Sequence, residues 1–214
     1  MSRHQGQERQ KFRTSRVLNI MMFQDREEAA RLLARKLKSL KKKETVVLGI
    51  TKGGVIVAKE IAEILTLPLR IIVIKKIGDP QNPELAMGAV GPKGVVFWWG
   101  KKDARGLQNK IAEQKNLEKK FGKNAELNLF GKNVILVDDG VATGATVLAA
   151  QKFLKKEKVK SIVLATPVIS KDTLNYIKEY FDRVVSLETV RQFHAVGEFY
   201  LNFPQVEDEE IINF

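Results

Sequence analysis

The sequence predicts an α/β fold in which helices flank a parallel central sheet and a small hood follows at the C-terminus. Short β-branched runs alternate with stretches whose apolar residues recur at helical spacing, as βαβ units require. Apolar residues make up 44% of the 214 residues, which is enough for a buried core. We therefore expect one domain over residues 16–214, with the hood at about 190–214, after a disordered basic tail over residues 1–15.

The first half of the chain predicts a helix, a strand, a second helix and a second strand. Asp25 and Glu28 have the spacing of a capping box, and leucines and alanines follow at helical spacing. A strand, a glycine turn, a helix and another strand indicate parallel strands joined by a crossover helix. The predicted elements are a helix at about Asp25–Leu40, a strand Thr45–Ile50, a helix Val55–Leu65 and a strand Leu69–Ile74.

The second half continues this alternation after a stretch rich in glycine and proline. Residues 75–93 cannot form a regular helix, so we expect an irregular loop there. From about Val190 the chain is aromatic, and we expect an irregular cap over the strand ends. The elements predicted between these segments are a short edge strand Val95–Trp99, a polar helix at about Ala104–Phe121, a strand Asn133–Val137, a helix Thr146–Lys156, and the alternating segments Ser161–Ala165, Leu174–Tyr180 and Val184–Leu187.

Positive charge is concentrated at the N-terminal end of the chain. Residues 1–43 hold 13 basic and 4 acidic side chains, whereas residues 44–214 hold 24 and 21. The basic tail is either a solvated extension or a contact for nucleic acid or another polyanion. The chain has no cysteine, which excludes disulfides and thiolate chemistry. Because the sequence also has neither a long apolar run nor a secretory signal, we expect a cytoplasmic protein without a membrane contact.

The stretch Val134–Thr146, VILVDDGVATGAT, carries the most specific chemistry. Four apolar residues predict a buried strand, and Asp138 and Asp139 follow at its end. Small residues and two threonines then lead into a helix, whose free N–H groups and hydroxyls bind an anion well. The adjacent carboxylates suit vicinal hydroxyls, or Mg²⁺ held through water. A ribose 5-phosphate combines these two chemical groups.

This stretch resembles the phosphoribosyl pyrophosphate (PRPP) motif of type I phosphoribosyltransferases. The resemblance implies that Asp138 and Asp139 hold the ribose hydroxyls and, through water, Mg²⁺. It also implies a phosphate loop that binds the 5-phosphate. The residues expected to bind PRPP are Asp138, Asp139, Gly140, Ala142, Thr143, Gly144, Ala145 and Thr146. As a whole, residues 23–210 are similar to an uncharacterised group of predicted phosphoribosyltransferases.

Two further segments fit the same family. In that fold a loop after the first core strand binds pyrophosphate, and Thr51, Lys52, Gly53 and Gly54 occupy its place. Residues 75–93 stand where the family has a mobile lid over PRPP, and Lys76 ends the preceding strand. Lys52 and Lys76 are therefore the expected catalytic cations, because positive charge stabilises the departing pyrophosphate.

The acceptor is not specified by the sequence. The 6-oxopurine enzymes of the family carry an aspartate before the Thr-Gly pair, where this chain has Ala142. This difference argues against a 6-oxopurine acceptor. Acceptor recognition is expected in the hood. The hood candidates are Phe193, His194, Phe199, Tyr200 and Phe203, which either stack on a planar base or pack the C-terminus onto the sheet.

Three functions follow from this resemblance. The first is a Mg²⁺-dependent phosphoribosyltransferase, a homodimer by family expectation, which displaces pyrophosphate from PRPP with an unidentified small nitrogen acceptor. The second is a regulatory protein that senses PRPP and binds nucleic acid through basic surface, although no nucleic-acid-binding motif precedes the domain. The third is a hydrolase or phosphorylase that uses another ribosyl phosphate.

Overall fold

The computed structural model describes residues 21–78, 86–100, 106–121 and 128–213, so the predicted tail over residues 1–15 lies outside the described residues. The helices are α1 Arg26–Leu37, α2 Gly53–Leu65, α3 Leu107–Phe121, α4 Ala145–Lys156, α5 Lys171–Ile177 and α6 Asp208–Ile212, with short 3₁₀ turns η1 Lys38–Leu40, η2 Pro92–Gly94, η4 Lys178–Tyr180 and η5 Val196–Phe199. The strands are β1 Thr45–Ile50, β2 Leu69–Ile72, β3 Lys75–Gly78, β4 Ala86–Val90, β5 Val96–Trp98, β6 Asn133–Val137, β7 Ser161–Ser170 and β8 Arg183–Val190.

The predicted parallel central sheet is confirmed. Its five strands follow the order β2-β1-β6-β7-β8, and all neighbouring pairs are parallel. β1 lies between β2 and β6, and its Val47 is paired with Leu69 of β2 on one side and with Ile135 of β6 on the other. The order reverses between β1 and β6, and the crevice at such a point is where open α/β sheets bind ligands.

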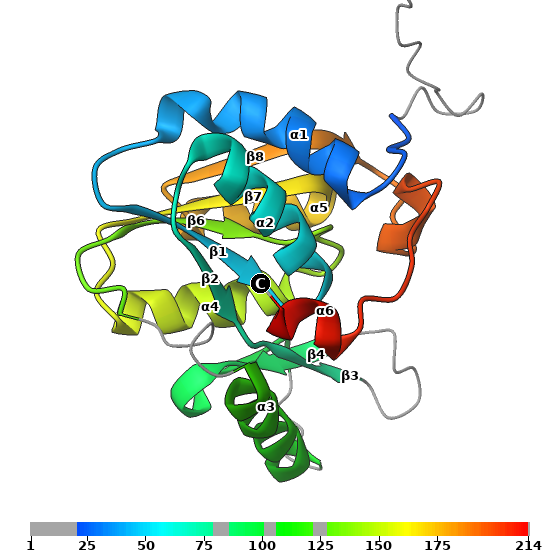
Figure 1. Ribbon diagram of the computed structural model, residues 1–214. Helices are drawn as coiled ribbons and strands as arrows, with labels where there is room; N and C mark the ends of the chain where they lie inside the picture. Colours follow the sequence, from blue (N-terminus) through cyan, green and yellow to red (C-terminus); the bar gives the residue numbers. More distant parts are fainter. Residues whose placement is uncertain (1–20, 79–85, 101–105, 122–127, 214) are drawn as a thin grey trace, which may run out of the picture.

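Alternate residues of the strands face opposite layers of helices. Val46 and Leu48 pack with α4 and α5 in one buried cluster, whereas Val47 packs with α1 and α2 in another. Figure 1 shows α1 and α2 above the sheet and α4 below it. The β-branched runs form strands because both of their faces are buried in this way.

Residues 75–93 differ from the irregular loop that the sequence predicts. β3 and β4 pair in an antiparallel hairpin, and β5 pairs with β4 to complete a second, three-stranded sheet. The glycines are part of this pairing: a Cβ at Gly88 would lie 2.4 Å from the Phe97 carbonyl oxygen, so glycine permits the close approach of β4 and β5. Residues 79–85 of the expected lid lie outside the described residues, and its mobility stays a prediction.

The C-terminal segment after β8 joins the N-terminal segment beside α1. Phe23 and Tyr200 form a parallel bridge, with hydrogen bonds from Phe23 N to Phe199 O and from Leu201 N to Phe23 O. The expected irregular cap therefore contains local order, namely η5, this bridge and α6. In Figure 1 the orange-to-red segment lies on the right, next to the start of α1. Among the described residues, none of the helices combines the length and the apolar character that a membrane span requires.

Candidate functional site

A pocket of about 170 Å³ lies where β1 and β6 end, and we call it the motif pocket. It brings together the loop after β1, the loop after β6 and one side chain of β3. Its lining residues are Ile50, Thr51, Lys52, Gly53, Lys76, Ala86, Asp138, Asp139, Gly140, Ala142, Thr143, Gly144, Thr146 and Val196. Most of the residues that the sequence assigns to PRPP therefore line one cavity. Gly54 and Ala145 are the two that are not among the lining residues.

Asp138 is the buried carboxylate of this pocket. Its Oδ1 accepts a hydrogen bond of 3.0 Å from the Asp139 N–H, and its Oδ2 accepts one of 3.3 Å from the Thr146 hydroxyl. Burial, followed by the negative charge of Asp139, raises the pKa of Asp138 to about 8, while the Lys76 ammonium acts in the opposite direction. Asp138 therefore holds a proton at neutral pH until a ligand or cation favours the carboxylate.

Asp139 has a partner that the sequence did not reveal. Its Oδ2 accepts a 2.9 Å hydrogen bond from Arg26 Nε, and both side chains are largely buried. The Tyr200 hydroxyl donates to the Asp139 carbonyl at 2.6 Å. Burial raises the pKa of Tyr200, so this hydroxyl keeps its proton and acts as a donor. The two acids of the motif therefore differ in their partners: Asp139 forms an ion pair with Arg26, whereas Asp138 accepts hydrogen bonds from an N–H and a hydroxyl.

Arg26 connects the motif to both ends of the described chain. Its Nη1 donates to the Pro204 carbonyl at 2.8 Å, and its guanidinium lies 3.7 Å from the centre of the Phe203 ring. The sequence contains a signal for this role. Arginine at the first position of a helix opposes the helix dipole, which favours acids there. A basic residue at that position needs a specific partner.

The loop after β1 approaches the motif very closely. The Thr51–Lys52 peptide bond is cis. A Cβ at Gly53 would lie 1.8 Å from Asp139 Oδ2, and a Cβ at Gly54 would lie 2.7 Å from the Val137 carbonyl oxygen. Both positions therefore require glycine for space. This contact fixes the expected pyrophosphate loop against the two acids.

Lys52 and Lys76 both line the motif pocket. The Lys52 ammonium lies 2.9 Å from Asp208 Oδ1 of α6, whose Oδ2 lies 2.8 Å from the Lys120 ammonium. These two lysines hold the pKa of Asp208 below its usual value. Asp208 lies in the acidic run Glu207–Glu210 and is a second residue of the site that the sequence did not reveal. The described residues provide no such acid partner for Lys76.

The predicted phosphate loop forms the turn between β6 and α4. Gly144 has φ +79°, a left-handed conformation that glycine tolerates well, and α4 begins at the next residue. The Thr173 hydroxyl donates to the Ala142 carbonyl, which fixes the loop from α5. Thr143 and Thr146 line the cavity beside the start of α4. The arrangement offers hydroxyls and helix N–H groups to an anion.

The hood reaches the pocket through an aliphatic side chain. Val196 lines the cavity, and a Cβ at Gly140 would lie 2.5 Å from Val196 Cγ1. Of the hood candidates, His194 is exposed. The other four candidates, Phe193, Phe199, Tyr200 and Phe203, pack with Phe23 and α1 in one apolar cluster. None of these five side chains is among the residues that line the motif pocket.

The carboxylates present fit Mg²⁺ only in combination with a ligand. The described residues contain no group of three or more His, Cys, Asp or Glu side chains that could hold a metal. Asp138 faces the pocket, whereas Asp139 is paired with Arg26. Mg²⁺ commonly uses one or two carboxylates together with water and substrate phosphates, which this donor set allows.

Comparisons with known proteins identify the family of this chain. A family model described as "Phosphoribosyl transferase domain" matches residues 21–204. A Mycobacterium tuberculosis protein named "Putative phosphoribosyl transferase" is 38% identical over 204 residues, which cover 90% of this chain and 46% of that protein. The chain thus spans about half the length of this curated relative.

Solved structures share the fold. TT1426 from Thermus thermophilus is 37% identical with a TM-score of 0.73, over 90% of this chain and 97% of that one. A purine phosphoribosyltransferase from Pyrococcus horikoshii, 22% identical over 85% and 89% of the two chains, has a TM-score of 0.50 and supports the fold alone. The match over residues 21–204 covers most of the chain, which therefore belongs to the phosphoribosyltransferase domain family.

Proposed function

We propose that this protein displaces pyrophosphate from C1 of PRPP with a small nitrogen nucleophile, in a reaction that depends on Mg²⁺. The observation that carries the proposal is the motif pocket. It places a buried carboxylate, a phosphate-binding turn and two lysines around one cavity. A sugar that carries a phosphate at one end and a pyrophosphate at the other needs this combination of groups.

The position of PRPP follows from the chemistry of each wall. The turn from Gly140 to Thr146 offers its N–H groups and hydroxyls to the 5-phosphate. Asp138 accepts hydrogen bonds from the ribose hydroxyls. The loop after β1 holds the pyrophosphate through its backbone, assisted by Lys52 and Lys76. Asp139 supports this arrangement indirectly, because its bond to Arg26 keeps its carboxylate beside Gly53.

Catalysis in this pocket consists of orientation and charge stabilisation. As the C1–oxygen bond breaks, positive charge develops on the ribose and negative charge on the pyrophosphate. The two lysines stabilise the leaving group, and the Asp138 carboxylate faces the sugar. Mg²⁺ bound to the pyrophosphate adds further positive charge there. No side chain of the pocket is required as a covalent nucleophile.

The acceptor enters beside the hood. Val196 offers an apolar contact, and Ala142 stands where the 6-oxopurine phosphoribosyltransferases have an aspartate that acts as general acid or base. An acceptor whose attacking nitrogen can lose its proton directly to water suits this site better than a 6-oxopurine. We also expect a homodimer, as the family resemblance implies.

The test is a screen of heterocyclic bases and primary amines with PRPP and Mg²⁺, scored by pyrophosphate release. The Asp138→Asn variant should lose PRPP binding and turnover while keeping the fold. The matched control is Glu179→Gln, which neutralises an exposed carboxylate on η4. If calorimetry shows no binding of PRPP or ribose 5-phosphate to the unmodified protein, the proposal is wrong.

A further inference from the structure

A basic surface lies at the end of the sheet opposite the motif pocket. In a parallel sheet all strands start at the same edge, so the loops that precede β1, β6 and β7 meet there. Hydrogen bonds join these loops: Asn133 N donates to Glu44 O, Lys160 N to Lys132 O, and Gly131 N to Lys158 O. We call this region the amino-edge surface, which comprises Lys42, Lys43, Phe130, Lys132, Lys156, Lys158 and Lys160.

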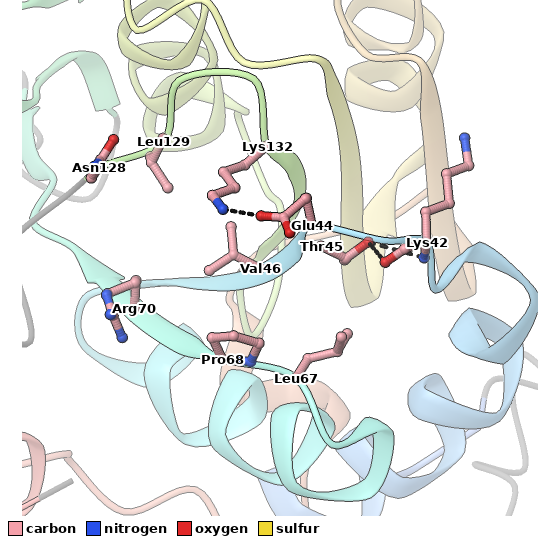
Figure 2. Close-up of a pocket in the computed structure, with 10 residues that line it drawn as sticks. All are labelled: Lys42, Glu44, Thr45, Val46, Leu67, Pro68, Arg70, Asn128, Leu129 and Lys132. Carbon is pink, nitrogen blue, oxygen red and sulfur yellow. Dashed lines mark hydrogen bonds and ion pairs between the residues drawn. The ribbon is translucent and has the colours of Figure 1, made fainter.

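Within the part of the chain that the structure describes, most cations of the amino-edge surface have no acidic partner. The two described acids of these loops are already engaged, since Glu44 is paired with Lys132 and Glu157 with Lys93; Glu126 of the loop before β6 lies outside the described residues. The other lysines of the surface are exposed, and among the described residues none of them forms an ion pair with a carboxylate. In Figure 2 the Lys42 side chain extends away from the other labelled residues. Uncompensated charge of this density attracts polyanions.

An exposed aromatic ring lies among these lysines. Phe130 is 71% exposed, although its neighbour Leu129 is buried in the core. A cavity of about 350 Å³ opens on the same edge, with Val46 and Leu129 among its lining residues and Lys132 and Arg70 at its sides (Figure 2). An exposed ring among cations suits a ligand that carries flat bases and phosphates.

We propose that the amino-edge surface binds single-stranded nucleic acid. The lysines contact successive phosphates, and an unpaired base stacks on Phe130. A single strand fits better than a duplex because its bases are free to stack on an exposed ring. The surface is separate from the motif pocket, since the six residues of β1 span about 20 Å between them.

The experiment measures fluorescence anisotropy of a labelled 20-nucleotide oligouridylate or oligothymidylate with the full chain at several salt concentrations. The variant Lys43→Glu/Lys158→Glu should weaken binding and reduce the slope of log affinity against log salt by about 1.4, because each phosphate contact in a single strand contributes ~0.7. Phe130→Ala should weaken binding about tenfold without changing that slope, because stacking releases no counterions.

Matched controls separate this surface from other basic regions. Lys171→Glu changes an exposed lysine at the start of α5, at the opposite edge of the sheet, and should leave binding within about twofold of the unmodified protein, since only screened long-range charge differs. Changing Lys43 and Lys158 to glutamine repeats the test without introducing acids. A variant of the whole chain with Arg9, Arg13 and Arg16 changed to glutamate tests the N-terminal region. Adding Phe130→Ala to this variant should still weaken binding about tenfold.

Several results would overturn the proposal. One is the absence of anisotropy change at about 50 mM salt, where phosphate contacts are strong. Another is loss of binding in the Arg9, Arg13 and Arg16 variant with no effect of the amino-edge variants. Binding to a duplex as tight as to the single strand, or to anionic phosphatidylserine vesicles without any binding of oligonucleotide, would equally refute it.

Discussion

Asp138 should make PRPP binding depend on pH near neutrality. Burial and the charge of Asp139 raise the pKa of this carboxyl to about 8 in the free protein. Binding of ribose hydroxyls and Mg²⁺ favours the carboxylate, so a proton must leave when PRPP binds. At pH 7, about one unit below the pKa, ionisation costs on the order of 1 kcal/mol. The affinity for Mg²⁺–PRPP should therefore rise about tenfold between pH 7 and pH 9.

Isothermal titration calorimetry in two buffers of different ionisation enthalpy measures this proton directly. About 0.9 proton should be released per PRPP bound at pH 7, falling towards about 0.1 at pH 9, because the carboxyl is then already ionised. The Asp138→Asn variant, which should lose PRPP binding, should show neither binding heat nor proton release. Equal affinity at pH 7 and pH 9, with no proton release in the unmodified protein, would refute the assignment of Asp138 as the ionising ligand of the sugar.

The same carboxyl should also affect stability. Its pKa in the folded protein lies well above the ordinary value for an aspartate, so the folded state holds the proton more tightly than the unfolded state. The free energy of unfolding should therefore decrease as pH rises from about 4 through about 8. Asp138→Asn removes this dependence and should stabilise the ligand-free protein most at pH 9. Urea denaturation at pH 6 and pH 9 compares the two proteins.

The remaining predictions concern residues that hold the pocket together. Arg26→Ala leaves Asp139 charged and largely buried, and should lower the free energy of unfolding by about 3 kcal/mol, measured by urea denaturation; a loss below about 1 kcal/mol would mean that the pair is solvated. Gly53→Ala should abolish PRPP binding in calorimetry, because the new Cβ would overlap Asp139 Oδ2; unchanged affinity would show that the loop moves easily. Asp208→Asn should strengthen pyrophosphate binding severalfold, because Lys52 loses its competing partner; weaker binding would mean that the carboxylate positions the lysine.

Local patterns predicted most of the central sheet and the first helix. Thr45–Ile50 was predicted as a strand and is β1, because its β-branched residues are buried on both faces. The Asp25 cap was also predicted, and the Asp25 side chain accepts the Glu28 N–H at 2.8 Å. The meeting of the loops after β1 and β6 followed from parallel topology alone. The strand and the helix cap depend on residues that are close together in the sequence.

Other features depend on contacts that local patterns do not contain. The β3–β4 hairpin was missed because Gly88 indicates a break in sequence, whereas in the fold it permits a close strand contact. The Arg26–Asp139 pair joins residues 113 positions apart. Lys52 and Asp208 are likewise distant in the chain, and a lone aspartate in an acidic segment resembles solvated surface. Such pairs require the assembled tertiary structure.

The bridge between Phe23 and Tyr200 has a consequence for biosynthesis. Arg26 and Asp139 are synthesised before Tyr200, Phe203 and Pro204, which fix them. A nascent chain that ends before residue 199 therefore contains all residues of the central sheet. In such a chain the Arg26–Asp139 pair lacks its contacts with Tyr200, Phe203 and Pro204, and Phe23 lacks its pairing with Tyr200. The motif pocket should therefore gain its full support only after residues 199–204 have been synthesised and have paired with the segment around Phe23.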